Sequence, residues 1–108
     1  MLALADTQAR RTPRFNGTLL DAVLARGRAA SPALADRMDR AAELVQWGRI
    51  VALSATSWEI RSEREPHRPY RLTPEGCTCA NTAPCEHRLA VALLFVCEQE
   101  TARRERLN

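Results

Sequence analysis

Four side chains that commonly bind metal ions lie within 11 residues of one another, and this cluster constrains the fold more than any other feature. Residues 77–87 read CTCANTAPCEH, which is C-x-C, a gap of five residues, and then C-x-H. Structural zinc sites bind the ion through four thiolate or imidazole ligands in a tetrahedron, with no open position. The pattern therefore predicts one structural Zn²⁺ ion. Its ligands would be Cys77, Cys79, Cys85 and His87.

The spacing within the cluster suits the backbone expected on each side of it. Residues two apart in an extended segment point the same way, so Cys77 and Cys79 can bind one ion together. Pro84 suits the first turn of a helix, and the positive end of a helix favours a thiolate at Cys85. Zinc binding should then be coupled to folding, because the end of a strand and the start of a helix meet around the ion.

Other uses of the thiols fit the sequence less well. Disulfides among the four cysteines would need an oxidising compartment, and the N-terminus does not read as a signal peptide. Copper(I) suits thiolates, but the histidine favours zinc. A redox dithiol normally uses C-x-x-C, and an iron–sulfur cluster normally uses four cysteines in a different spacing. Cys97 lies ten residues after His87 and is predicted to pack in the core.

The length and composition indicate one small domain of mildly basic character. The chain has 108 residues, a formal charge of +3 and a pI near 9.0. All 16 basic residues are arginine, which fits either bidentate phosphate recognition or a GC-rich genome. The longest apolar run, residues 89–97, is far too short to cross a membrane. We therefore expect a cytoplasmic protein, nucleoid-associated if it binds DNA, with no membrane partner and no small-molecule substrate.

A flexible tail is predicted at residues 1–16, followed by a first helix. Thr18 and Asp21 resemble a capping box, with Asp in place of Glu. An apolar stripe follows, and Gly27 with the next three residues, Arg28, Ala29 and Ala30, is expected to mark the end of this helix. The stripe consists of Leu19, Leu20, Val23 and Leu24.

A second helix is predicted between Ser31 and Gly48. Ser31 can cap it, Pro32 suits its first position and Gly48 suits its C-terminal end. Its apolar face would comprise Leu34, Met38, Ala41 and Val45. Residues 17–48 thus form a helical lead-in, expected as a helical hairpin; a DNA-reading helix-turn-helix is the alternative.

Short strands and a last helix complete the predicted α+β fold. The segments Ile50–Leu53, Ser57–Ser62 and Pro69–Thr73 are apolar or alternate with a period of two, which indicates a small antiparallel meander. A final helix is expected from about Pro84, buried in its apolar first half and charged where it projects into solvent, at residues 98–106. The fold is therefore an N-terminal helical hairpin, a β-meander and a zinc knuckle that leads into a C-terminal helix.

The cysteine–histidine pattern, with its surroundings, resembles the SWIM-type zinc finger. Members of that family have a β-hairpin before the first cysteine pair, which residues 58–62 and 70–72 resemble. They carry a basic residue after the histidine and then an apolar helix, as in Arg88 and the residues that follow. The resemblance covers residues 49–97 and suggests a finger domain at 49–108, of a small bacterial or mobile-element type. The gap between the ligand pairs is short, and the aromatic residue often found there is missing from Ala80–Thr82.

The resemblance implies a binding module and not an enzyme. Nucleic acid, with DNA favoured, is the first expected partner, and a role as a protein–protein adaptor within a larger DNA-processing complex is the alternative. Glutamates interleave with the basic residues of the hairpin, which is also typical of an ordinary solvated face. No paired acid, phosphate-binding loop or activated nucleophile is evident, so we expect no catalytic residues. The candidate nucleic-acid contacts are Arg61, Arg64, His67, Arg68, Arg71 and Arg88.

Overall fold

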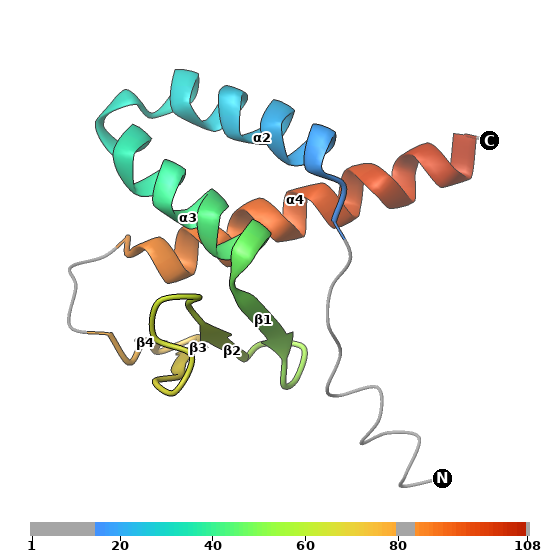
Figure 1. Ribbon diagram of the computed structural model, residues 1–108. Helices are drawn as coiled ribbons and strands as arrows, with labels where there is room; N and C mark the ends of the chain where they lie inside the picture. Colours follow the sequence, from blue (N-terminus) through green and yellow to red (C-terminus); the bar gives the residue numbers. More distant parts are fainter. Residues whose placement is uncertain (1–14, 80–83, 108) are drawn as a thin grey trace, which may run out of the picture.

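The chain adopts the predicted α+β fold, with a helical hairpin, a four-stranded antiparallel sheet and a long C-terminal helix. The computed structural model describes residues 15–79 and 84–107, so most of the predicted tail lies outside these ranges. In Figure 1 the C-terminal helix runs through the middle, with the hairpin on one side and the sheet on the other. The elements are α2 (Gly17–Ala30), a 3-10 turn η1 (Pro32–Leu34), α3 (Ala35–Trp47), β1 (Arg49–Ala52), β2 (Trp58–Arg61), β3 (Tyr70–Thr73), β4 (Gly76–Cys77) and α4 (Glu86–Leu107).

Helix α2 begins one residue before the predicted start and ends at Ala30, the last residue of the segment predicted to end it. Asn16 caps it, because its side-chain oxygen accepts a hydrogen bond from the Leu19 N–H at 3.1 Å. The expected capping box at Thr18 is therefore wrong. Gly27 lies inside the helix, where a Cβ atom would come within 3.0 Å of the Met38 Sδ atom. The glycine allows α2 and α3 to approach closely and does not end the helix.

Helix α3 ends where predicted but starts later. Ser31 makes no side-chain capping bond, and the proline segment forms η1 before α3 begins. At the other end the Gly48 N–H donates to the Leu44 carbonyl at 3.0 Å. A Cβ on Gly48 would come within 2.7 Å of the Arg61 carbonyl oxygen, so this glycine is required where the chain passes directly from α3 into β1.

The sheet has strand order β1-β2-β3-β4, with every neighbouring pair antiparallel. Ile50 pairs with Ile60, and Leu72 pairs with Cys77, so these four side chains lie on the inner face. The alternation predicted for β2 and β3 is confirmed by this register. The fourth strand was not predicted; Gly76, with φ of 137°, provides the tight turn that folds β4 back onto β3.

The hairpin, the sheet and α4 share one hydrophobic core. Ile60, Ala90 and Cys97 are completely buried, which confirms that Cys97 is a packing residue. The buried members are Leu19, Leu20, Val23, Ala41, Ala42, Leu44, Val45, Ile50, Ile60, Leu72, Ala90, Leu93, Leu94 and Cys97.

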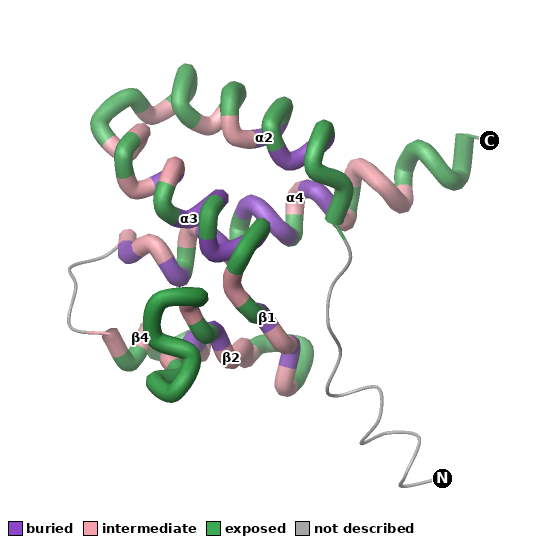
Figure 2. Tube along the Cα trace, viewed as in Figure 1, coloured by how far each residue is buried: buried purple, intermediate pink, exposed green. Residues whose placement is uncertain are grey.

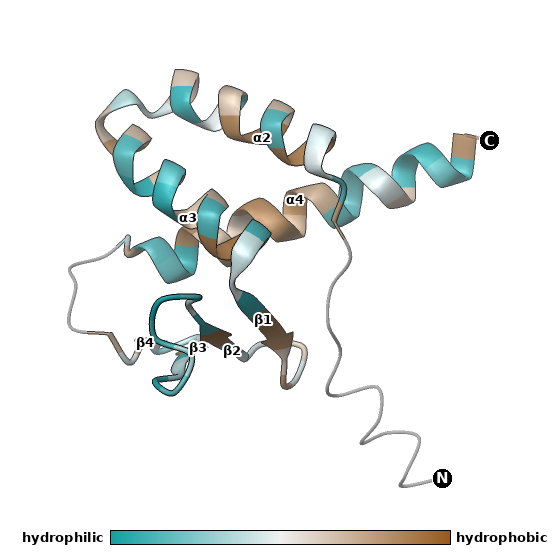
Figure 3. Cartoon of the chain, viewed as in Figure 1, coloured by the Kyte–Doolittle hydropathy of each residue, from teal (hydrophilic) through white to brown (hydrophobic). Residues whose placement is uncertain are grey.

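Burial of α4 differs from the prediction. Its central turns are hydrophobic (Figure 3), and Figure 2 shows that buried stretches alternate along the helix with intermediate and exposed ones. Ala92 and Phe95 are exposed, Phe95 to 53% of its surface. The expectation that the apolar first half is buried on all sides is therefore wrong, because the hairpin and the sheet cover only part of the helix. Within the described residues, no helix is both long and apolar enough to cross a membrane.

Candidate metal centre

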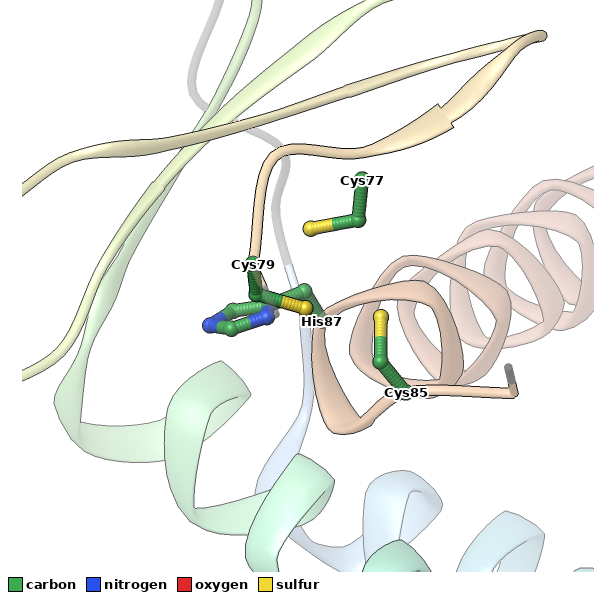
Figure 4. A group of neighbouring side chains, drawn as sticks. All are labelled: Cys77, Cys79, Cys85 and His87. Atoms are coloured by element: carbon green, nitrogen blue, oxygen red, sulfur yellow. The ribbon is translucent and has the colours of Figure 1, made fainter. Parts of the chain in front are cut away.

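The end of the sheet places the first two cysteines beside the core. Cys77 is the last residue of β4, and its pairing with Leu72 puts it on the inner face, where it packs against the core. Cys79 follows two residues later, beyond the end of β4. Figure 4 shows the Cys77 and Cys79 side chains pointing into one space, which the Cys85 and His87 side chains also border from the start of α4.

The start of α4 supplies the other pair. Helix α4 begins at Glu86, and the Arg88 N–H donates to the Cys85 Sγ atom at 3.4 Å. The Cys85 carbonyl also accepts from the Leu89 N–H at 3.1 Å. Cys85 therefore occupies the N-cap position, where its sulfur receives a free N–H group and the positive end of the helix favours a negative charge.

His87 is buried, with 4% of its surface exposed. Its ring packs on that of Tyr70 from β3, with centroids 4.5 Å apart at an interplanar angle of 33°. Its Nδ1 atom is buried without a hydrogen-bond partner among the described residues. An unpaired buried nitrogen is costly, so this atom requires a partner such as a metal ion. Burial also lowers the pKa of His87, which keeps the imidazole in the neutral form that binds metals.

The neighbouring thiols act in opposite directions on the pKa values of Cys77 and Cys85. Burial, together with the nearby Cys79 and Cys85 sulfur atoms, raises the pKa of Cys77 to about 12. Burial also acts to raise the pKa of Cys85, but hydrogen bonds from the Arg88 N–H and the neighbouring thiols outweigh it, so its pKa is lowered. The metal-free cluster thus favours a thiolate at Cys85, and a bound cation would favour the thiolate form of each cysteine that binds it.

The geometry of the four residues fits one tetrahedral ion. Their ligand atoms all lie within 4.8 Å of one another. Metal–sulfur bonds of about 2.3 Å in a tetrahedron would place neighbouring sulfur atoms about 3.8 Å apart, so only small movements are needed. Cys77, Cys79, Cys85 and His87 therefore lie close enough to hold one metal ion, and all four cysteines of the chain are free thiols.

Helix α3 fastens the segment that leads into the second ligand pair. The Arg37 Nη1 atom donates to the Pro84 carbonyl oxygen at 3.0 Å, next to Cys85. The Arg40 Nε atom donates to the Glu86 carboxylate at 3.1 Å. Sequence reasoning missed both contacts, because no local pattern indicates that residues 46 and 47 positions apart will meet.

The candidate nucleic-acid contacts do not form a single surface. Arg61 and Arg71 lie on the outer face of the sheet, and the Arg61 guanidinium binds the Glu59 carboxylate at 2.9 Å. Arg88 is exposed elsewhere, in a groove that Trp58 and Leu72 of the inner face also line. The other three, Arg64, His67 and Arg68, are exposed in the loop between β2 and β3.

Two further residues near the outer face were missed from the sequence. Arg49 pairs with Arg61 in the register of β1 and β2, so it projects from the same face. Trp47 ends α3 and exposes 62% of its surface. In the sequence these two residues flank Gly48. Only the direct passage from α3 into β1 shows that they lie near the outer face of the sheet.

Comparisons of the chain with protein-family models, with curated proteins and with solved structures give no match.

Proposed function

We propose that the protein is a SWIM-type zinc-finger module that holds one structural Zn²⁺ ion and binds nucleic acid, preferentially DNA, through the outer face of its sheet. The proposed metal follows from the donor set, because three thiolates and one imidazole in a closed tetrahedron are the ligands of structural zinc. When bound, zinc would join the end of β4 to the start of α4 and contribute folding free energy.

The ion has an organising role in this proposal and no catalytic one. Four protein ligands leave no coordination position for water or substrate, which a catalytic zinc needs. The unpaired Nδ1 atom of His87 supports the assignment, because coordination would satisfy it. The SWIM-type assignment itself rests on the spacing C-x-C and C-x-H, the preceding strands and the following apolar helix.

The observation that carries the binding proposal is the charge of the outer sheet face. Arg49, Arg61 and Arg71 project from it, and Glu59 is the acidic side chain that the strand registers place among them. Arg49 and Arg71 form no side-chain ion pair within the described residues, so their guanidinium groups are free for phosphate oxygens. The adjoining loop carries the acidic residues Glu63 and Glu65, which would repel phosphate, so the proposed binding surface is limited to the strands.

Titration of labelled DNA tests this proposal. The zinc-loaded protein should bind duplex or single-stranded DNA, and affinity should fall steeply with salt, because phosphate contacts release counterions. An Arg49→Glu, Arg71→Glu double variant should bind at least about tenfold more weakly at low salt, with a salt slope reduced by about 2. An Arg104→Glu, Arg106→Glu double variant, which makes the same charge change on the exposed end of α4, is the matched control. The proposal would be wrong if the protein bound no DNA at low salt, or if the control variant lost as much DNA affinity as the Arg49→Glu, Arg71→Glu variant.

A further inference from the structure

Helix α4 presents an exposed apolar ridge between two apolar grooves. The ridge is formed by Ala92 and Phe95, which the hairpin and the sheet leave uncovered. The first groove, of about 340 Å³, lies between the hairpin and α4 and is lined by Val23, Arg26, Gly27, Met38, Leu89, Ala92, Leu93 and Val96. The second, also of about 340 Å³, lies between the sheet and α4, where Trp58, Leu72, Arg88, Val91, Ala92 and Phe95 contribute to its wall.

Ala92 lines both grooves, so the ridge and the grooves form one continuous surface. This surface is apolar, with exposed Phe95 and Ala92 at its centre and half-buried Leu89 and Val96 beside them. Contiguous exposed apolar surface of this kind is typical of interaction sites. We call this continuous region the α4 surface.

The charges at the edges of the α4 surface are all positive. Arg26 is the charged residue of the first groove, and Arg88 is that of the second. Neither guanidinium forms an ion pair with a carboxylate of residues 15–79 or 84–107. Glu100 lies near enough to Arg26 for that charge to help lower its pKa, but its carboxylate binds Arg103 at 2.9 Å.

We propose that the α4 surface docks an amphipathic helix of a protein partner, with large apolar side chains in the two grooves and acidic side chains facing Arg26 and Arg88. A helix laid into an apolar groove recognises its partner through such apolar anchors, and the flanking charges set its specificity. The α4 surface is distinct from the outer sheet face, so this inference does not depend on nucleic-acid binding.

The positive charges also argue against two other occupants of the α4 surface, a second copy of this chain and the chain's own residues 1–14. A second copy of this chain would bring its own Arg26 and Arg88 to the same rim, where like charges repel. The chain's own residues 1–14 contain three arginines and one aspartate, so they would add positive charge to a positive rim. An acidic partner is the occupant that complements both grooves.

A peptide-display selection against the zinc-loaded full chain tests the proposal. The library holds peptides of about 16 residues, or about four helical turns, with fixed apolar positions at i, i+3, i+4 and i+7 and random flanking positions. We expect the selected peptides to be enriched in Asp and Glu. A selected peptide, made synthetically, should bind Phe95→Glu more than about tenfold more weakly than the parent, since central aromatic residues dominate such interfaces. Arg88→Glu should weaken it severalfold.

Controls separate docking from a general loss of structure. Arg104→Glu, which reverses a charge at the far end of the same helix, should bind the peptide as the parent does. Phe95→Gln removes the aromatic ring without adding charge and should also weaken binding, with zinc content and helicity unchanged, because Phe95 is half exposed.

Three results would overturn the inference. One is a selection that yields no acidic preference or peptides insensitive to both Phe95 variants. The second is a stable dimer, measured by light scattering, that Phe95→Glu dissociates, because a second copy would then be the occupant. The third is a rise of about tenfold or more in peptide affinity when residues 1–14 are deleted, because the chain's own tail would then cover the surface.

Discussion

Replacing Arg37 with alanine should loosen the metal centre without altering any of its four ligands. The Arg37 guanidinium donates to the Pro84 carbonyl oxygen at 3.0 Å, one residue before Cys85. A hydrogen bond that involves a charged group contributes about 1.5–3 kcal/mol, and the partial exposure of Arg37 reduces this to roughly 1–1.5 kcal/mol. Since 1.4 kcal/mol is a tenfold change in an equilibrium constant, zinc affinity should fall by roughly five- to tenfold.

Competition with a chromophoric zinc chelator measures this change directly. Arg28→Ala is the matched control, because Arg28 forms an ion pair with Asp39 at 2.6 Å that joins α2 to α3 and is remote from the ligands. It should shift zinc affinity by less than about twofold, since exposed ion pairs contribute little. If Arg37→Ala binds zinc as tightly as the parent, or if both variants lose affinity equally, the role assigned to Arg37 in positioning Cys85 is wrong.

Three further outcomes follow from the core and the metal centre. Ile60→Ala, at a completely buried site, should lower the free energy of unfolding of the zinc-loaded protein by about 3–4 kcal/mol in urea titration; a loss below about 1 kcal/mol would contradict the core assignment. Removing zinc with EDTA should lower the thermal midpoint by about 15 °C or more, because metal at a thousandfold excess over its Kd stabilises by about 4 kcal/mol; an unchanged midpoint would exclude structural zinc. The pKa of His87 is lowered in the folded protein, so the unfolded chain binds the proton more readily. The free energy of unfolding should therefore be highest above the ordinary histidine pKa and should decline as the pH falls below it. A free energy of unfolding that stays constant between pH 7 and 5, or a His87→Gln variant with the same pH dependence as the parent, would contradict this.

Much of the fold was predictable because the apolar residues that recur with a regular period in the sequence are the ones that face the core. Trp58 and Ile60 alternate with charged residues, and both face the core as predicted. The proximity of Cys77, Cys79, Cys85 and His87 was predictable for a different reason, since the two pairs can bind one ion only if the strand end and the helix start meet.

Features that depend on distant contacts were not predictable. Gly27 reads as the beginning of a helix end in the sequence, but it lies inside α2, where the Met38 side chain from α3 approaches it closely. Phe95 lies in an apolar run, and only the placement of the hairpin and the sheet shows that 53% of its surface stays exposed. Arg88 follows His87 directly, yet the first turn of α4 directs it away from the outer sheet face.

X-ray absorption at the zinc edge, on protein purified without added metal, is the most direct test of a closed zinc site. We expect about one zinc per chain, with three sulfur atoms at about 2.3 Å and one nitrogen at about 2.0 Å, from Cys77, Cys79, Cys85 and His87. A Cys85→Ser variant should lose one sulfur from this shell or lose the ion. Protein that folds without zinc, or a shell that contains a water oxygen or fewer than three sulfur atoms, would contradict a closed structural site.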